Sequence, residues 1–478
     1  MIQINKINTW GCTLILLICA SCGSSKHLPD IPKSNLPESF SYDTSTSFVD
    51  STETVANLSY KEFFNDQHLI SLIESGLQQN NNMQVAIKQI EIANQTMKQA
   101  KWGYLPIINL SAASSSITRS SDNSLNGIMA SQFTGKPYIE DYSSMIDMSW
   151  EADIWGKIKN QKAGALARYL ESIEAVKAVR TNLVARIAQG YYNLLMLDEQ
   201  KLVSTHNQAI VDSTLVMVKV QNRLGISNSL AVKQLENSRD NLSKYIRQID
   251  ENVTTQEYAL KALVGDFPKR STTRSRLTDL NERNSFATGV PISLLELRPD
   301  IKQAEYIFRR SVSDFKFARA NMYPSLRITA QGGLNAFRAS DWFSIPGSLF
   351  GIVAGSLTQP LLQGRQLKTA YNQATIRSEQ AELQYKESVL QAVTEVSTIL
   401  EQIASLRDRQ TFTGQQVARN QELIQQTNIM FRNDMATYLE VLAAQQSKLS
   451  AEIEQMQIKA QLLYAEVALY KALGGGVN

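Results

Sequence analysis

Cysteine and histidine are scarce in this 478-residue chain, and each scarcity excludes a kind of site. All three cysteines lie within the first 22 residues, so the rest of the chain has no disulfide, thiolate metal site or cysteine nucleophile. The three histidines are far apart in the sequence, which argues against a histidine metal cluster. The serines form no G-x-S-x-G elbow, and Gly474–Gly476 is not followed by the Lys-Ser/Thr pair of a phosphate loop. We therefore expect neither an enzyme nor a bound cofactor.

Proline and glycine are also sparse, with 11 and 22 residues, and long stretches carry neither. Because both residue types end or bend helices, their scarcity favours a few very long helices over many short elements. The charge is nearly balanced, with 48 Lys and Arg against 45 Asp and Glu and a net charge of +3. This balance gives no indication of a nucleic-acid partner.

The first 21 residues have the pattern of a signal peptide. Lys6 precedes the apolar run Leu14–Ile18, which is far too short to span a bilayer. The run leads into Cys19–Gly23, which resembles a bacterial lipobox, although Cys19 stands where leucine is usual. We expect Cys22 to be lipidated and residues 22–59 to form a polar tether; an ordinary cleaved signal peptide is the alternative.

The remaining chain contains the same transition twice: a predicted helix ends at a proline and a predicted strand follows it. Tyr323-Pro324 ends a long helical pattern and is followed by alternating residues, and Pro106 does the same earlier. Proline lacks a backbone donor and pushes its predecessor out of the helical region. The two similar halves indicate an internal duplication, with repeats over 60–265 and 291–478 and a polar linker over 266–290.

Each half is expected to contain a helix, then two strands joined by a polar loop. In the first half the predicted elements are helix Tyr60–Trp102 with a break at Asn80–Asn82, strand Ile107–Thr118, loop Arg119–Lys136 and strand Tyr142–Trp150. In the second half they are helix Ile292–Asn321, a strand after Pro324, loop Gly332–Pro346 and strand Leu349–Leu357.

A long helical hairpin follows the strands in each half. Lys157–Arg223 contains no proline, breaks at Leu224–Asn228 and is followed by a return helix that ends at Gly265. The second half repeats this pattern with a turn at Arg432–Asp434. Apolar residues with a period near 3.5 predict that each pair packs as an antiparallel coiled coil. In the first return helix they are Leu235, Leu242, Ile246, Ile249, Val253, Leu260 and Leu263.

Four strands per chain cannot close a barrel, and an open sheet exposes unpaired edges. If the strands enter lipid, closure is compulsory, because no water is there to satisfy the backbone groups. The chain must therefore form an oligomer, or another structure must cover its sheet. Trp150 and Trp155 are expected at the rim of such a sheet.

Six segments match motifs of one family in the same order. They are Trp150–Gly156, Leu295–Ile301, Ala318–Ala320 with Tyr323–Leu326, Gln359–Leu361, Tyr438–Leu442 and Leu469–Gly476. Through them the chain resembles TolC-type outer-membrane efflux channels, in the lipoprotein branch that serves tripartite pumps. The resemblance extends from about Tyr60 to Gly476.

The resemblance implies an α fold combined with a membrane β-barrel, built from long antiparallel coiled-coil helices and four strands per chain. Three chains would form a homotrimer whose strands complete one twelve-stranded barrel in the lipid of the outer membrane. A helical tunnel would continue the barrel across the periplasm. Such a channel passively conducts small molecules to the outside, and its partners are an RND-type inner-membrane pump and a periplasmic adaptor (membrane fusion) protein.

The resemblance also implies roles for the two hairpin turns. Phe431, Asp434 and Glu440 would form the periplasmic gate. Phe431 lacks the hydroxyl of a tyrosine, and Ala231 stands where a second carboxylate is common. We therefore expect a gate held by few hydrogen bonds, with acidic rings from Asp434 and Glu440 in the trimer. The residues expected to contact the adaptor are Leu224, Gly225, Ile226, Ser227, Asn433, Met435, Ala436 and Thr437.

Two other functions stay open at this point: a type I secretion duct, and a periplasmic coiled-coil scaffold lipoprotein without a barrel. The alternation of Ile146, Met148 and Trp150 favours a channel over a scaffold. The lipobox and the Leu297–Ile301 motif favour small-molecule efflux over protein secretion.

Overall fold

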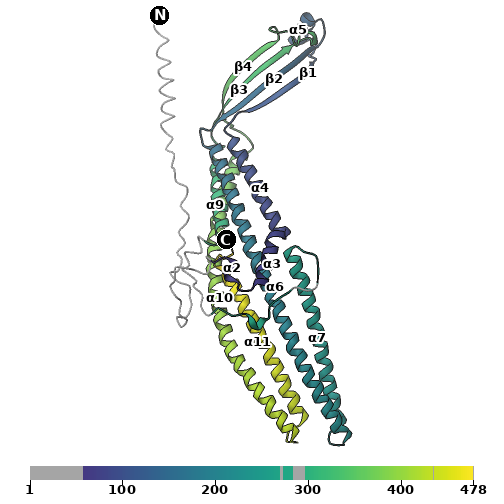
Figure 1. The fold of residues 1–478 in the computed structure, drawn as a ribbon. Helices are drawn as coiled ribbons and strands as arrows, with labels where there is room; N and C mark the ends of the chain where they lie inside the picture. Colours follow the sequence, from purple (N-terminus) through teal and green to yellow (C-terminus); the bar gives the residue numbers. More distant parts are fainter. Residues whose placement is uncertain (1–57, 270–272, 284–296, 434, 477–478) are drawn as a thin grey trace. The chain divides into compact units, whose positions relative to one another are not determined.

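The computed structural model describes residues 58–269, 273–283, 297–433 and 435–476. The predicted signal peptide, the lipidated Cys22, nearly all of the tether, Asp434 and parts of the linker lie outside these described residues. Long helices and one sheet make up the described fold (Figure 1). Within the described ranges, no helix is both long and apolar enough to cross a membrane.

The described part of the chain begins with three helices where the sequence predicted one interrupted helix. They are α2 (Tyr60–Phe63), α3 (Gln67–Gln79) and α4 (Asn81–Trp102). The break at Asn80 is confirmed: its side chain accepts a hydrogen bond from the Met83 backbone N–H at 3.0 Å. The break before α3 was missed, and Asp66 causes it by capping that helix through the backbone N–H groups of His68 and Leu69.

Four antiparallel strands form a single sheet in the order β1-β2-β3-β4 (Figure 1). Their bounds are Ile107–Thr118 for β1, Ile139–Ala152 for β2, Ser325–Ala336 for β3 and Leu349–Thr358 for β4. The bounds of β1 are as predicted, whereas β2 is longer.

The prediction that a loop begins at Gly332 is wrong, because β3 continues through Gly332 and Gly333. A Cβ atom on Gly333 would lie 2.0 Å from the Ser144 carbonyl oxygen of β2. Glycine at this position therefore permits close approach of two strands rather than a turn.

The prediction that Arg119–Lys136 is only a loop is also wrong, because it contains helix α5 (Leu125–Thr134). The hydroxyl of Ser124 accepts the Gly127 N–H at 3.1 Å, and Gly135 ends the helix with a φ of +69°. The other connection, between β3 and β4, contains the short 3₁₀ helix η4 (Ala339–Asp341).

Two long helical hairpins make up most of the chain. They are α6 (Lys157–Arg223) with α7 (Ser229–Val264), and α10 (Gln366–Arg432) with α11 (Tyr438–Ala472). The bounds of α6 are those predicted. Of the predicted seam on α7, Leu235, Leu242, Ile249 and Leu260 are buried. Helix α9 (Pro299–Ala320) precedes β3, and the 3₁₀ helix η2 (Leu277–Asp279) lies in the linker.

The core forms around α6, which packs against α4, α7, α9 and α11. Ile187, Tyr191 and Leu194 of α6 are completely buried. The aromatic ring of Tyr470 from α11 stacks on Phe63 with a centroid distance of 4.1 Å. The N-terminal helices and the C-terminal helix are thereby joined in one core.

Candidate functional site

The strand register divides the sheet into an apolar face and a polar face. One row across the four strands is Ile108, Met148, Ala330 and Val353, and the adjacent row on the opposite face is Asn109, Asp147, Gln331 and Ile352. Successive side chains of a strand point to opposite faces, so each row repeats along its own side. The members of the apolar face include Ile108, Leu110, Ile146, Val353 and Leu357, all of them exposed in the single chain.

The polar face holds its own hydrogen bonds and ion pairs. The Asn109 amide donates to the Asp147 carboxylate at 2.8 Å, and Arg327 lies 3.7 Å from Glu151. The exceptions on this face include four apolar side chains: Ile107, Met145, Phe350 and Ile352. A sheet with this division can separate an apolar medium on one side from water on the other.

Aromatic side chains bind the ends of the strands to the adjoining helices. The indole N–H of Trp150 donates to the Tyr104 carbonyl at 2.9 Å, and that of Trp155 donates to the Pro324 carbonyl at 2.7 Å. Trp155 also stacks on Tyr323 at 4.8 Å. Both tryptophans thus lie where the strands meet the helices, in agreement with their expected place at the rim of the sheet.

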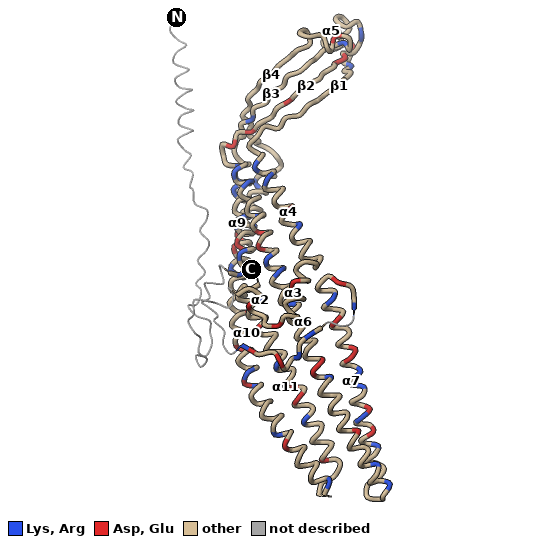
Figure 2. The backbone as a smooth tube through the Cα atoms, viewed as in Figure 1, with Lys and Arg blue, Asp and Glu red and all other residues tan. Residues whose placement is uncertain are grey.

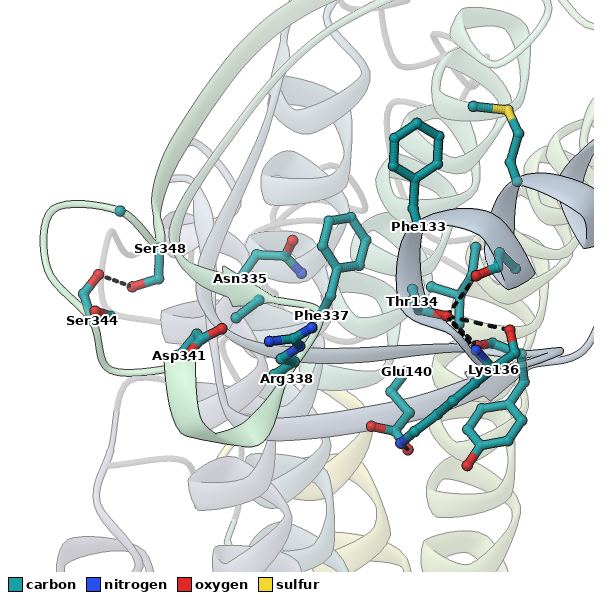
Figure 3. A pocket seen from close by; sticks show the side chains of 16 residues that line it. Phe133, Thr134, Lys136, Glu140, Asn335, Phe337, Arg338, Asp341, Ser344 and Ser348 are labelled. Atoms are coloured by element: carbon teal, nitrogen blue, oxygen red, sulfur yellow. Dashed lines mark hydrogen bonds and ion pairs between the residues drawn. The ribbon is translucent and has the colours of Figure 1, made fainter.

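At the other end of the strands, α5 and the β3–β4 connection line a pocket of about 800 Å³ (Figure 3). Phe133 comes from α5, and Phe337, Arg338 and Asp341 come from the segment after β3. Lys136 forms an ion pair with Glu140 at 2.8 Å in the same pocket. The pocket holds no catalytic arrangement, and no group of three metal-ligating side chains occurs in the part of the chain that the structure describes.

Both hairpin turns contain a backbone hydrogen bond from an N–H group to the carbonyl five residues earlier. In the α6–α7 turn the Ile226 N–H donates to the Gln221 carbonyl at 2.9 Å, across Gly225 with its φ of +79°. In the α10–α11 turn the Met435 N–H donates to the Met430 carbonyl at 2.9 Å. These bonds satisfy carbonyls at the ends of the two longest helices.

The eight residues predicted to contact an adaptor all lie in these two turns. Ser227 and Ala436 are half-buried and the other six are exposed. The exposed fractions of Leu224, Ile226 and Met435 are 69%, 65% and 64%. Apolar side chains this exposed give the turns a surface suited to binding another protein.

An apolar cluster holds the two hairpins together close to their turns. Tyr438 of α11 donates a hydrogen bond to the Gln234 side chain of α7, and Gln445 donates to the Thr214 hydroxyl at 3.3 Å. The predicted gate residue Phe431 belongs to this cluster and is only 8% exposed. The buried members are Leu215, Val218, Ala231, Leu235, Phe431 and Val441.

The two turns differ in how the following helix is capped. Glu440 is exposed, and its carboxylate accepts hydrogen bonds from the backbone N–H and the hydroxyl of Thr437, forming a capping box. At the corresponding place in the first half, Asn228 caps α7 by accepting the Ala231 N–H at 2.9 Å, and Ala231 is completely buried. The structure therefore brings Phe431 and Ala231 into one cluster and leaves Glu440 outside it.

The linker between the halves contains polar contacts that no local sequence pattern could locate. Arg274 donates to both Asp198 and Glu257, and the contact to Glu257 measures 2.6 Å. The Arg283 backbone N–H donates to the buried Glu466 carboxylate at 3.0 Å. Burial raises the pKa of Glu466 to about 7, although the Arg283 N–H acts in the opposite direction.

Comparison with known proteins agrees with this architecture. Residues 72–266 and 290–475 match the family described as outer membrane efflux protein. Cation efflux system protein CusC of Escherichia coli O6:H1 is 24% identical, with 97% of each chain covered. The probable outer membrane lipoprotein SilC of Salmonella typhimurium is 23% identical, with 98% of each chain covered. The solved open state of the Neisseria gonorrhoeae MtrE outer membrane channel has a TM-score of 0.81 at 22% identity, covering 94% of this chain and 98% of that one, and shows the shared fold.

Proposed function

Since the chain belongs to the outer membrane efflux protein family, we propose that it is the outer-membrane channel of a tripartite efflux system. In this role it passively conducts small molecules from an inner-membrane pump and a periplasmic adaptor to the outside. The observation that carries the proposal is the division of the sheet into an apolar and a polar face. A periplasmic scaffold would gain nothing from exposing Leu110, Val353 and Leu357 on one side of a sheet.

Closure of the sheet requires further copies of the chain. Strands β1 and β4 are the two edges of the sheet, and unpaired backbone groups are costly in lipid. Pairing of β4 with β1 of the next copy satisfies both edges. Three copies of the four-stranded sheet give a closed twelve-stranded barrel, with the apolar face toward lipid and the polar face toward the lumen. The hairpins of the homotrimer then form the periplasmic tunnel.

The hairpin turns are the proposed contact with the adaptor, which in turn joins an RND-type pump. The supporting observation is the exposure of Leu224, Ile226 and Met435 on two adjacent turns. Phe431, Asp434 and Glu440 are the proposed gate. Because Phe431 packs between the hairpins, separation of the hairpins on opening would expose its ring.

Attachment of the N-terminus to the membrane through a lipidated Cys22 completes the proposal. SilC, a relative over nearly its whole length, is itself described as a probable outer membrane lipoprotein. Two or more acyl chains give stable anchoring, at roughly 0.8 kcal/mol for each buried methylene.

Reconstitution of the purified protein into planar lipid bilayers tests the proposed function. We expect discrete single-channel steps, with conductance that needs no energy source. A protein that binds the bilayer through its anchor without conducting ions would contradict the channel and restore the scaffold alternative.

A further inference from the structure

Positive side chains gather on the helices where they adjoin the sheet. In Figure 2 these helix ends carry more blue segments than red ones. Lysine and arginine are almost balanced by acidic residues over the whole chain, so the excess is local. We define the basic collar as six exposed side chains from α4, α6, α9 and the start of α10: Lys101, Lys159, Lys162, Arg319, Arg365 and Lys368.

The collar has little negative charge near it. Glu151 already pairs with Lys157 at 2.9 Å, and the Asp153 carboxylate caps α6 by accepting the Ile158 backbone N–H at 2.9 Å. Asp314 is the single carboxylate on the same helical turns. No carboxylate in the described parts of the chain forms an ion pair with any of the six collar residues. Their charge is therefore available to an external anion.

A band of apolar and aromatic side chains separates the collar from the sheet. Trp102 is 68% exposed, and Leu361 and Leu362 are 87% and 96% exposed. The ammonium group of Lys162 lies 6.0 Å from the ring centre of Tyr104. An apolar face, then aromatic side chains, then cations is the order found across the boundary between lipid tails and headgroups.

We propose that the basic collar binds anionic phospholipid headgroups in the leaflet of the outer membrane that faces the helices. This inference rests on the proposed function, which places the apolar face of the sheet in lipid. The collar residues come from four helices rather than from one face of one helix, and they adjoin fully exposed leucines. That distribution suits a lipid layer that follows the outward side of the trimer better than one acidic protein docked at a single place.

Native mass spectrometry of the detergent-purified protein, with phosphatidylglycerol or phosphatidylcholine added, tests the collar. The collar variant carries Lys159→Gln, Lys162→Gln, Arg365→Gln and Lys368→Gln. We expect the wild-type protein to retain phosphatidylglycerol preferentially, and the variant to lose at least about tenfold of that preference. Added salt should weaken retention by the wild-type protein. The matched control removes the same charge from exposed positions of the hairpins and carries Lys233→Gln, Lys244→Gln, Arg247→Gln and Arg419→Gln. It should retain phosphatidylglycerol as the wild-type protein does.

Three results would overturn the collar as a lipid site. The first is that the collar variant retains as much phosphatidylglycerol as the wild-type protein. The second is that the control variant loses as much of it as the collar variant does. The third is that the collar variant has an altered ion selectivity but unchanged lipid retention, which would place these cations in the lumen. Conductance in phosphatidylcholine bilayers separates this inference from the proposed function. A wild-type protein that conducts but has no lipid preference refutes only the collar, whereas one that does not conduct refutes the channel.

Discussion

At the scale of single residues, the duplicated halves differ at their hairpin turns. Glu440 has a carboxylate in solvent, while Ala231 at the corresponding place is buried between the hairpins. Only the second turn of each chain thus places a carboxylate at this position. In a trimer the proposed acidic ring at this position would contain three Glu440 side chains rather than six carboxylates.

Removing these carboxylates should change conduction. We expect Glu440→Ala, alone or with Asp434→Ala, to alter single-channel conductance or to reduce the preference for cations. Glu440→Gln is the matched variant, because glutamine retains the capping box with Thr437 while it removes the charge. Only the alanine variant should lose helix capping, at a cost of about 1 kcal/mol. Unchanged conductance and selectivity in the double variant would contradict the acidic gate.

Glu466 should make stability depend on pH. Its pKa is raised from 4.5 to about 7 by burial, so between these values the folded chain holds a proton that the unfolded chain releases. The contribution of this proton to the free energy of unfolding is therefore fully present below about pH 4.5. It is lost as the pH rises through 7, and the total loss is about 3 kcal/mol.

Thermal unfolding at pH 4.5 and pH 8 checks this dependence. Glu466→Gln has no charge at either pH and still offers an oxygen to the Arg283 N–H. The melting temperature of this variant should therefore exceed that of the wild-type protein only at pH 8. The exposed Glu422→Gln serves as the control and should follow the wild-type protein. Parallel pH profiles for Glu466→Gln and the wild-type protein would refute the assignment.

At the scale of elements, the sheet depends on close contact between β2 and β3. The Gly333→Ala substitution would force a Cβ atom to within 2.0 Å of the Ser144 carbonyl, so we expect it to destabilise the sheet by about 2 to 3 kcal/mol. Gly355→Ala in β4 meets nothing within 4 Å and should be tolerated. Thermal unfolding, followed by the β-sheet signal in circular dichroism, compares the two variants. Equal melting of both would show that the β2–β3 contact relaxes freely.

Long elements were the easiest to predict from the sequence. The bounds of α6 were predicted because Lys157–Arg223 has no proline and only two glycines, Gly164 and Gly190. Helix α5 was missed because it is only ten residues long and its apolar residues show little helical period, although Ser124 and Gly135 are ordinary capping signals for it. Glycines in β3 were mistaken for a turn because the strand that they approach is distant in the sequence.

The candidate site was predictable only in part, because some of its contacts join elements that are distant in the sequence. The hairpin turns could be located from local signals such as Gly225 and Asn228, which act within a few residues. The burial of Phe431 and its packing against Ala231 depend on how two hairpins meet, and no local pattern encodes that. The hydrogen bonds of Arg274 to Asp198 and Glu257 likewise join elements that are far apart in the sequence.

At the scale of the whole molecule, anchoring and assembly should be separable. The Cys22→Ser substitution removes the acyl attachment site but leaves the sheet edges β1 and β4 unchanged. We expect mass spectrometry to show that the variant lacks the acyl chains, while cross-linking still detects trimers that their barrel holds in the membrane. Complete loss of the trimer in this variant would argue against a simple tether.

Single-particle imaging of the protein, extracted from outer membranes in mild detergent, shows directly whether three chains close one barrel. We expect threefold particles in which three sheets close into one short barrel, continued by a helical tube on the order of 100 Å long. A soluble monomer or dimer without a barrel would contradict both the channel and the closure of the sheet by neighbouring chains.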